Sequence, residues 1–421
     1  MKTPVLDLAI VGAGLAGLAA ARRAQELGLE VEIFEASDGV GGRVRSDQVG
    51  GFICDRGFQL INPAYPDLAR YYRPDRFHHL EEAIDVVIGE RSYRLGDPRI
   101  GLSTFAGNLS PATGSVSEKF RFLRYVQGLA KSSPHVIAED HSFEDEMLSR
   151  DIGAFYSRVI GPFASGVFLN LPSRISARVA RELIHYFLIG KPGVPVGGVG
   201  EVTRTLASGL TIHLDSAVDE LGDGYLRLGR RRIKARAVIV ATDLYAAKSL
   251  FDLDGAKKRH LSSSTAGKMS GSTTWYHSVK RDDFPGVLRI DGNGAGPVTN
   301  TIAISRLAPE YAPQGMTLIS TTVMSAYGQE VSESRVRKHL AHLWRSDTSN
   351  WDLVAKYAIA KSLPLMNPGV DTPGTLDLSL TPRRGRPGML RYLAGDFLAL
   401  PAQQGAAASG IKAVEEIADR L

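Results

Sequence analysis

Cysteine is almost absent from this sequence of 421 residues, in which Cys54 is the only one. A single cysteine excludes an internal disulfide and a metal site built from several cysteines, and it fits a reducing compartment. Long hydrophobic runs are also lacking, so no segment has the length and apolarity of a transmembrane helix. We therefore expect a cytoplasmic globular protein, long enough for two large substructures.

A strong charge of one sign is missing too. The sequence has 50 Lys and Arg against 45 Asp and Glu, a formal net charge of +5, which suits an anionic cofactor or substrate. The densest basic cluster, residues 230–236, is predicted to lie in a hairpin that turns at Gly229, with Lys234 and Arg236 pointing outward. No aromatic residues interleave with these charges, so no nucleic-acid partner is expected.

Histidines do not group with cysteines or carboxylates in a metal-binding pattern. His78 and His79 are adjacent, and His339 and His342 share one polar face of a predicted helix, but neither pair has the ligand set that a metal needs. We expect no metal site, and solvated side chains at His339 and His342.

The most informative stretch is the glycine motif Gly12-Ala13-Gly14-Leu15-Ala16-Gly17, which follows an apolar run, 6–11. A small-residue helix is predicted to run from it to about residue 27, and a second strand, 31–34, ends in Glu35. In such a unit the first glycine permits the tight turn, the second lets the backbone approach a pyrophosphate, and the third lets helix and strand pack closely. The helix N-terminus offers free N–H groups to the phosphates, and Glu35 offers an acceptor to a ribose hydroxyl.

Two other interpretations of this start are a tight turn without a ligand and a cleaved signal peptide over 8–21. A signal peptide begins with basic residues, and only Lys2 precedes the apolar region, while Asp7 interrupts it. The regular order of strand, glycines, helix, strand and acid therefore predicts a dinucleotide site.

Further glycine segments lie beyond this unit. Gly41-Gly42-Arg43 follows Glu35, where adjacent glycines let the backbone pass a ligand and a guanidinium can pair with phosphate. Asp55-Arg56-Gly57-Phe58-Gln59 forms a glycine-centred turn after a short strand, 51–54. Near the end of the chain, an apolar strand closes on Gly395-Asp396, and a helix opens near Gln404-Gly405-Ala406.

In this order the motifs resemble the flavin-containing amine oxidase superfamily, which includes monoamine and polyamine oxidases, protoporphyrinogen oxidases and phytoene desaturases. The middle of the chain agrees, with Gly197-Gly198-Val199-Gly200 opening a helix, Val218 in an expected strand, and the apolar strand 237–243. The sequence looks most like bacterial FAD-dependent oxidoreductases of this superfamily that lack an assigned substrate.

The resemblance implies an α/β fold in two discontinuous domains. A Rossmann-like FAD-binding domain would comprise residues 1–62, 196–250 and 380–421. An α+β substrate domain with a mixed sheet would comprise residues 63–195 and 251–379.

The resemblance also implies FAD as the cofactor, held without a covalent bond. Monoamine oxidases attach flavin through a cysteine shortly before the terminal Gly-Asp segment, whereas Cys54 lies near the N-terminus. Val218 would contact the adenine through its backbone, Asp396 the ribityl and phosphate oxygens, and the last helix would point its N-terminus at the flavin ring. The expected cofactor residues are Gly12, Gly14, Leu15, Ala16, Gly17, Glu35, Ala36, Gly41, Gly42, Arg43, Val44, Gly57, Phe58, Gln59, Val218, Ala241, Thr242, Gly395, Asp396, Gln404, Gly405 and Ala406.

Catalysis in this superfamily passes a hydride from a substrate C–H bond to flavin N5, and O2 or another acceptor reoxidises the flavin. The catalytic side chains stay unassigned. Lys268 is a candidate for a lysine that some members keep beside N5, although an ordinary surface lysine is the simpler interpretation. Tyr276 is a second candidate, and since it neighbours Trp275 in one predicted strand, only one of the two can face the flavin.

Several functions remain open at this stage. An amine substrate would predict an aromatic cage, whereas a polyene or porphyrinogen would predict a long apolar tunnel and contact with a membrane surface, which the sequence itself does not indicate. A non-catalytic protein like the Rab GDP-dissociation inhibitors would predict degraded flavin contacts. An NAD(P)-dependent dehydrogenase would not need the terminal Gly395-Asp396 and Gly405-Ala406 segments.

Overall fold

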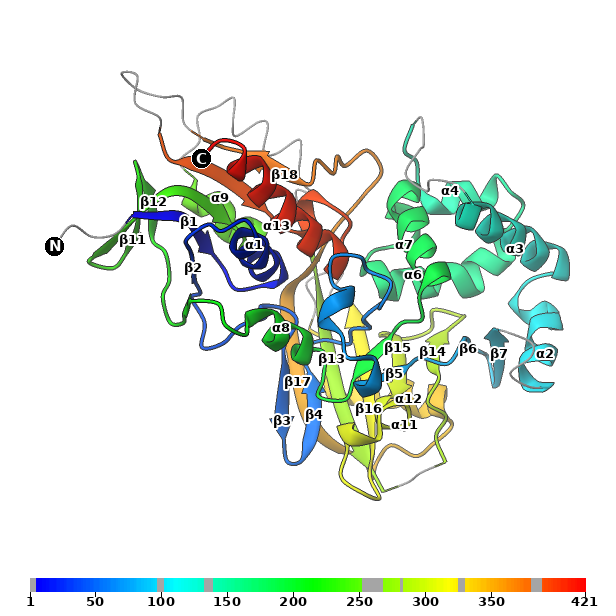
Figure 1. Cartoon of the computed structure of the whole chain (residues 1–421). Helices are drawn as coiled ribbons and strands as arrows, with labels where there is room; N and C mark the ends of the chain where they lie inside the picture. The colour runs from blue at the N-terminus through cyan, green and yellow to red at the C-terminus, as the bar shows by residue number, and fades with distance from the viewer. Residues whose placement is uncertain are drawn as a thin grey trace.

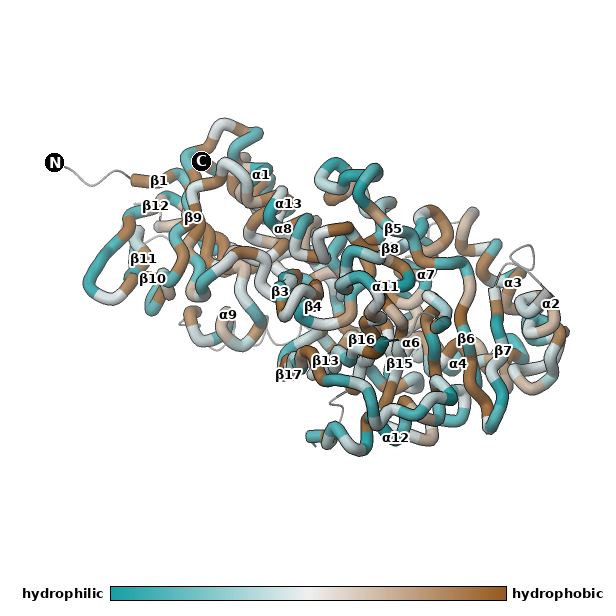
Figure 2. The backbone as a smooth tube through the Cα atoms, turned by 90° about the horizontal axis from the view of Figure 1, so that it is seen from below, coloured by the Kyte–Doolittle hydropathy of each residue, from teal (hydrophilic) through white to brown (hydrophobic). Residues whose placement is uncertain are grey.

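Two sheets, each assembled from distant parts of the chain, organise the molecule (Figure 1). The computed structural model describes residues 5–96, 102–131, 139–251, 268–280, 283–324, 330–379 and 388–421. The first sheet and a region of helices lie toward opposite ends in both Figure 1 and Figure 2, and in Figure 1 the second sheet lies below the helices.

The first sheet has eight strands in the order β10-β11-β12-β1-β2-β9, with β19 also paired to β12 and β18 to β19. The pairs of β1 with β2, β1 with β12 and β12 with β19 are parallel, which is why these strands are apolar on both faces. The strands are β1 (Val5–Val11), β2 (Val31–Phe34), β9 (Ile212–His213), β10 (Glu220–Gly222), β11 (Tyr225–Leu228), β12 (Arg231–Val240), β18 (Thr375–Asp377) and β19 (Leu390–Ala394).

Helices α1 (Leu15–Glu26) and α13 (Gln403–Ala418) pack against each other beside this sheet (Figure 1). Glycines allow the close approach, because a Cβ at Gly410 would lie 2.0 Å from the Ala16 carbonyl oxygen. A Cβ at Gly17 would likewise lie 2.0 Å from the Gly12 carbonyl oxygen, so α1 packs tightly onto its own turn. Both helices are thereby fixed with their N-termini at the edge where the parallel strands end.

The second sheet has seven strands in the order β17-β13-β16-β15-β14-β6-β7, and it is mixed, because β14 and β6 run parallel. One face carries α12 (Glu333–Trp344) over a core that includes Trp275 and Trp344. The strands are β6 (Ala83–Ile88), β7 (Arg91–Gly96), β13 (Met269–Val279), β14 (Leu288–Asp291), β15 (Val298–Ala303), β16 (Thr317–Met324) and β17 (Asp352–Pro364).

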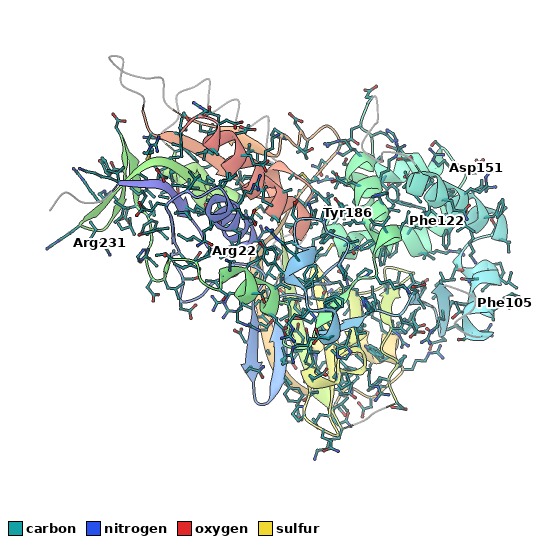
Figure 3. All side chains as sticks on the ribbon, viewed as in Figure 1. Arg22, Phe105, Phe122, Asp151, Tyr186 and Arg231 are labelled. Atoms are coloured by element: carbon teal, nitrogen blue, oxygen red, sulfur yellow. The ribbon has the colours of Figure 1, made fainter. Side chains whose placement is uncertain are left out.

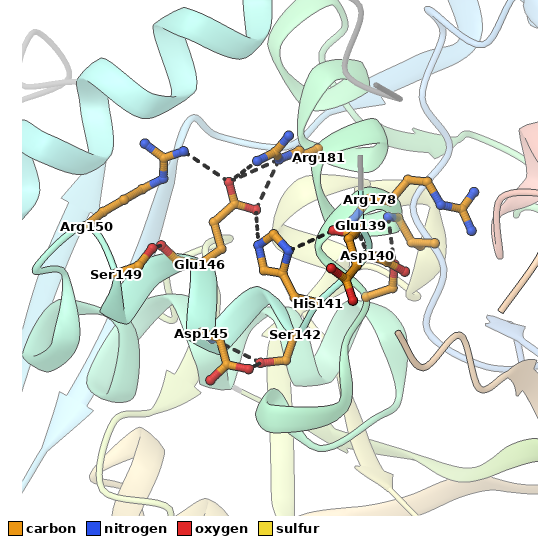
Figure 4. A network of polar contacts seen from close by, with 12 residues as sticks. Glu139, Asp140, His141, Ser142, Asp145, Glu146, Ser149, Arg150, Arg178 and Arg181 are labelled. Atoms are coloured by element: carbon orange, nitrogen blue, oxygen red, sulfur yellow. Dashed lines mark hydrogen bonds and ion pairs between the residues drawn. The ribbon is translucent and has the colours of Figure 1, made fainter. Parts of the chain in front are cut away.

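The helical region lies beyond the other face of the second sheet. Its helices are α2 (Leu102–Leu109), α3 (Val116–Lys131), α4 (Phe143–Leu148), α5 (Gly153–Phe155), a π-helical turn (Tyr156–Ile160), α6 (Gly161–Phe168) and α7 (Ala177–Ile189). A polar network joins α4 to α7, in which the buried Glu146 accepts a hydrogen bond of 3.0 Å from Arg181 Nε and pairs with Arg150 at 3.3 Å (Figure 4). Because Glu146 is buried, both arginines compensate its charge, and Arg181 links α7 to α4.

Shorter elements connect these parts. They are β3 (Ser46–Val49), β4 (Phe52–Asp55), β5 (Phe77–His79), β8 (Gly193–Pro195), α8 (Gly200–Ala207), α9 (Leu244–Leu250), α11 (Ile304–Leu307), and one-turn 3-10 helices at Ala69–Tyr71, Pro74–Arg76, Pro111–Thr113, Pro172–Arg174, Pro309–Tyr311 and Asp396–Leu398.

The expected α/β class with a Rossmann-like sheet and a mixed sheet is confirmed. One local expectation was wrong: Val218 precedes β10 and is not in a strand, because the antiparallel pairing with β11 begins only at Glu220. The domain boundaries stay a prediction, and β18 of the first sheet lies before the expected boundary at residue 380. Within the described ranges, no helix combines the length and apolarity required to cross a bilayer.

Candidate active site

The glycine motif forms an open cradle between β1 and α1. Gly12 has a φ of +104°, in the left-handed region that favours glycine, and a Cβ there would lie 2.8 Å from the Ala241 carbonyl oxygen. Gly14 is the N-cap of α1, and no side chain caps the helix. A Cβ at Gly14 would have no neighbour within 4 Å, so the first N–H groups of α1 face open space. An uncapped helix N-terminus of this kind attracts anions such as phosphate.

Glu35 lies at the edge of this cradle, directly after β2. Its Oε2 accepts a hydrogen bond of 2.7 Å from Ala13 N, and its Oε1 accepts bonds from Ser37 N (2.9 Å) and Ser37 Oγ (2.7 Å). These bonds fix the carboxylate where the cavity described below begins, so that one acceptor has a defined position beside the cradle.

Arg43 and Asp396 pair with each other across the two ends of the chain. Arg43 Nη1 lies 2.9 Å from Asp396 Oδ2, and Nη2 lies 2.8 Å from Oδ1. Arg43 Nη1 also donates to the Ser362 carbonyl oxygen at 2.7 Å, which ties β17 to the pair. Burial alone would lower the pKa of Arg43, but the charge and hydrogen bonds of Asp396 outweigh it, so the pKa is raised above its ordinary value. Arg43 therefore stays charged in the site.

A second uncapped helix N-terminus faces the same space. Helix α13 has Ala402 as its N-cap without a side-chain cap, and Ala402, Gln403 and Ala406 line the cavity. Gly405 instead packs against the Leu400 backbone, where a Cβ would lie 1.9 Å from the carbonyl oxygen. Gln404 points away from the cavity, and its Oε1 accepts a hydrogen bond of 3.3 Å from Asp67 N.

The turn at Gly57 connects these parts to the second sheet. Gln59 Nε2 donates to the Arg43 carbonyl oxygen at 2.7 Å, and Gln59 Oε1 accepts from Gln403 Nε2 at 3.3 Å. Phe58 N donates to Thr274 Oγ1 on β13 at 3.3 Å. The turn thus links the Arg43 loop, the start of α13 and the cavity face of the second sheet.

One cavity of about 1010 Å3 extends over all these groups and continues into the helical region. The continuation, which we call the apolar chamber, is lined by aliphatic and aromatic side chains from α3, α5, the π-helical turn, α6, α7, β6 and β14. Figure 3 labels Phe122 of α3 among these helices, while Phe105 of α2 lies at the outer end of the molecule. The chamber side chains include Ile84, Phe122, Val126, Phe155, Ile160, Phe163, Val167, Phe168, Leu183, Ile184, Phe187, Leu288 and Ile290.

All but four of the predicted cofactor residues line this cavity. The exceptions are Gly17, Val218, Gln404 and Gly405, which serve packing or bond elsewhere. Contact of the remaining set with FAD stays a prediction, but the structure brings these residues together from three distant parts of the chain.

Neither candidate catalytic residue lines the cavity. Lys268 is exposed at the start of β13, which corresponds to an ordinary surface lysine. Tyr276 is buried, and its hydroxyl donates to the Asp55 carbonyl oxygen at 3.0 Å. Trp275 packs on the opposite face under α12, as the alternation of a strand predicts. The cavity-lining positions of β13 are instead Ser272 and Thr274.

Sequence reasoning missed Lys361 of β17, which does line the cavity. Its Nζ lies 3.0 Å from Asp243 Oδ1 and 4.8 Å from the centre of the Tyr245 ring. It stands in a long strand without a motif, so no local pattern distinguishes it from other lysines.

Cys54 and His339, two residues considered from the sequence, are both buried outside the cavity lining. Cys54 is buried outside the cavity lining, and burial, with the charges of Asp55 and Asp47, raises its pKa to about 12. The expectation of a solvated His339 was wrong, because this side chain is buried and its Nε2 lies 3.1 Å from Asp291 Oδ2.

A short part of the chain is similar to a protein of known name. It is 44% identical over 61 residues to protoporphyrinogen oxidase 2, chloroplastic/mitochondrial, of Arabidopsis thaliana, a match that covers 14% of this chain and 12% of that protein. The chain thus matches only a small part of this curated relative.

Solved structures match the chain over almost its whole length. A wild-type putrescine oxidase bound to putrescine covers 99% of this chain and is itself covered to 99%, with a TM-score of 0.70 and 18% identity. A putative protoporphyrinogen oxidase from Exiguobacterium covers 99% of this chain and is covered to 100%, with a TM-score of 0.69 and 17% identity. At these identities the likeness establishes the fold alone.

The family described as flavin containing amine oxidoreductase has a model that matches residues 15–418. This match gives no support to the alternative of a GDP-dissociation-inhibitor-like protein. It confirms the predicted superfamily and the class of flavin-containing oxidoreductases. Because the match extends over nearly the whole chain, the protein belongs to the flavin containing amine oxidoreductase family.

Proposed function

We propose that this protein is an FAD-dependent oxidoreductase that holds its flavin without a covalent bond and oxidises a largely apolar organic molecule. The observation that carries the proposal is one continuous cavity that begins at two uncapped helix N-termini and continues into the apolar chamber. Its volume, about 1010 Å3, lies at the upper end of the ~300–1,000 Å3 usual for ligand pockets, as expected for a space that holds two molecules.

The cofactor end fits a flavin dinucleotide. The Gly12–Gly14 backbone and the first turn of α1 would hold the pyrophosphate, and the Glu35 carboxylate would hold a ribose hydroxyl. Arg43 supplies a positive charge beside these groups, and the N-terminus of α13 adds positive potential at the other end. When bound, FAD supplies a ring that accepts a hydride from a substrate.

The absence of a second cysteine supports a non-covalent flavin. Cys54 is the only cysteine, it lies in an apolar cluster, and its raised pKa keeps the thiol protonated. A protonated, buried thiol is a poor nucleophile and has no contact with the cavity.

The apolar chamber supports an apolar substrate over an amine. Among the described residues, no acidic side chain of α3, α6 or α7 lines it, so an ammonium group among these helices would have no counter-charge from them. The cavity is also lined by Glu81 and Glu82, just before β6, and Glu82 pairs with Lys191 at 2.5 Å. The acids at the cofactor end already have partners: Asp396 pairs with Arg43, and Asp243 pairs with Lys361. Burial of apolar surface stabilises a bound molecule by roughly 25 cal/mol per Å2, so this lining favours long hydrocarbon groups. It also keeps water away from the reacting atoms.

The proposal is tested on the purified protein in two steps. Acid denaturation should release a flavin that chromatographs as FAD, in about one equivalent per chain, with none left on the polypeptide. Oxygen consumption with a polyene, a porphyrinogen and putrescine then compares substrate classes, and an external electron acceptor is added for reactions that do not use O2. We expect turnover with an apolar class. A colourless protein that does not take up FAD, or turnover with putrescine alone, would overturn the proposal.

A further inference from the structure

Three polar side chains form a row across the second sheet, on the face that lines the cavity. Strand pairing places Thr274 of β13 opposite Thr322 of β16, and Thr322 opposite Asn300 of β15. All three line the cavity and are buried, with exposed fractions of 1%, 5% and 6% for Thr274, Thr322 and Asn300. We call these three residues the polar row.

The polar row is short of hydrogen-bond partners. Within the described ranges, Thr322 Oγ1 is fully buried without a hydrogen-bond partner. The Asn300 side-chain amide makes no hydrogen bond to a described residue. Thr274 Oγ1 accepts one bond, of 3.3 Å, from Phe58 N. On the opposite face of the same strands, the Thr301 and Thr321 hydroxyls lie 3.1 Å apart and share a hydrogen bond, whereas Trp275 Nε1 is buried without a partner in the described parts of the chain. Because buried polar groups are usually satisfied, the orphaned groups of the cavity face indicate a partner that comes from the cavity.

The polar row stands at the junction between the cofactor end and the apolar chamber. Thr274 bonds to the Gly57 turn, which also contacts the start of α13. At the other end, Asn300 pairs with Ile290 of β14, whose side chain belongs to the chamber. Gly166 of α6 leaves room for the amide, because a Cβ there would lie 2.5 Å from Asn300 Nδ2.

We infer that the polar row binds a neutral oxygen function, a hydroxyl or a carbonyl, on the otherwise apolar substrate. This inference rests on the proposed function and narrows its substrate class. Threonine hydroxyls and a carboxamide can both donate and accept hydrogen bonds, so together they match either group. The row carries no charge, so an ammonium or a carboxylate would lose its hydration without gaining a counter-charge. A pure hydrocarbon would leave Thr322 and Asn300 unpaired.

Binding of matched probes to the holoenzyme tests this inference. The probes are decanol, decanone, decane and decylamine, and binding is measured from the change each causes in the visible absorption of the flavin. We expect decanol or decanone to bind about tenfold more tightly than decane. This is the difference in affinity expected from one or two additional hydrogen bonds. Decylamine should bind more weakly than either.

Two variants and a control assign the effect to the row. Thr322→Val and Asn300→Leu keep the side-chain volume and should remove most of the preference for the oxygen probes while leaving decane binding unchanged. Thr273→Val is the matched control, because Thr273 neighbours Thr274 in β13 and points to the opposite face. It should leave all probe affinities unchanged. Without a ligand, Thr322→Val should also raise Tm, since it removes a buried hydroxyl that has no partner.

The outcomes separate this inference from the proposed function. If flavin is present and decane binds as tightly as decanol and decanone, the inference is wrong while the proposed function stands. An unchanged preference in both row variants would also overturn it. If no FAD is present, or if only decylamine binds, the proposed function fails and the inference falls with it.

Discussion

Arg43 and Asp396, 353 positions apart in the sequence, meet in a two-point ion pair with N–O distances of 2.8 and 2.9 Å. Asp396 is almost fully buried, whereas the Arg43 side chain is about one-third exposed. The pair joins the loop after β2, the carboxyl end of β19 and, through the Ser362 carbonyl, the strand β17. It therefore holds the cofactor end of the cavity together.

Replacing Arg43 should affect both stability and cofactor binding. Arg43→Gln leaves the Asp396 charge buried without its partner, which should lower the free energy of unfolding by roughly 2 kcal/mol and weaken FAD binding at least tenfold. The measurements are urea unfolding of the apoprotein and fluorescence titration with FAD. Arg23→Gln is the control, because the Arg23–Glu415 pair lies at the surface and should contribute no more than about 1 kcal/mol. Equal effects of the two changes would contradict this role for Arg43.

A side chain at Gly14 should prevent FAD binding without unfolding the protein. The backbone at Gly14 has a φ of −75°, which any residue can adopt, and a Cβ there meets no other atom within 4 Å. In Gly14→Val the new methyl groups would cover the first N–H groups of α1, so purified protein should contain less than about a tenth of the FAD of the wild type. Gly128→Val, on the exposed part of α3 where a Cβ would also meet no other atom within 4 Å, serves as the control for the same substitution. Full FAD content in Gly14→Val would show that the start of α1 does not bind the pyrophosphate of FAD.

Asp55 should make stability depend on pH in the direction opposite to a carboxyl whose pKa is lowered on folding. Its carboxyl is buried and accepts bonds from Ser46 Oγ (2.6 Å), Val199 N (3.0 Å) and Tyr311 Oη (3.1 Å), yet burial raises its pKa to about 6. The folded state therefore holds this proton up to a higher pH than the unfolded state does. The Asp55 contribution to stability is lost as pH rises from about 4 to about 6.

Chemical unfolding at several pH values can measure the contribution of Asp55 to the free energy of unfolding. The stability of Asp55→Asn relative to the wild type should grow by roughly 2–3 kcal/mol between pH values of about 4 and 7, since one pKa unit corresponds to about 1.4 kcal/mol. A difference that is constant with pH would mean that Asp55 titrates as an ordinary carboxyl.

Filling the apolar chamber should affect the substrate and spare the flavin. Val167 of α6 lines the chamber and is only partly buried, so Val167→Trp can place its ring in the cavity. We expect unchanged FAD content and a KM for the apolar substrate that is at least about tenfold higher. Val116→Trp, at an exposed position of α3, is the control. Loss of flavin in Val167→Trp would indicate that the chamber and the cofactor end are not separate parts of the cavity.

Local sequence patterns were sufficient to predict the glycine cradle between β1 and α1. The Gly12–Gly17 motif, the β2 strand and Glu35 lie within one short unit whose backbone conformation the glycines determine, and the hairpin at Gly229 follows the alternation of its side chains. The same holds for the predicted helix that carries His339 and His342, expected near residues 332–345 and observed as α12 from Glu333 to Trp344.

The parts of the site that depend on distant pairing could not be predicted. No periodicity indicates that Arg43 pairs with Asp396, that Lys361 reaches the cavity, or that Thr274, Thr322 and Asn300 stand in one row. His339 illustrates the same limit, because its helix face looked polar although Asp291 of β14 covers it. Such contacts arise from strand register and helix placement, which single-sequence patterns do not encode.

Anaerobic reduction of the bound flavin tests the central claim most directly, because it follows the reaction within the cavity and needs no knowledge of the final electron acceptor. The holoenzyme is mixed with a polyene, a porphyrinogen or putrescine under exclusion of O2, and the loss of the visible flavin absorption is followed in time. We expect an apolar class of substrate to bleach the flavin rapidly and putrescine not to bleach it. In Val167→Trp, bleaching by the apolar substrate should be at least about tenfold slower. Bleaching by putrescine alone, at a rate that Val167→Trp leaves unchanged, would contradict the central claim.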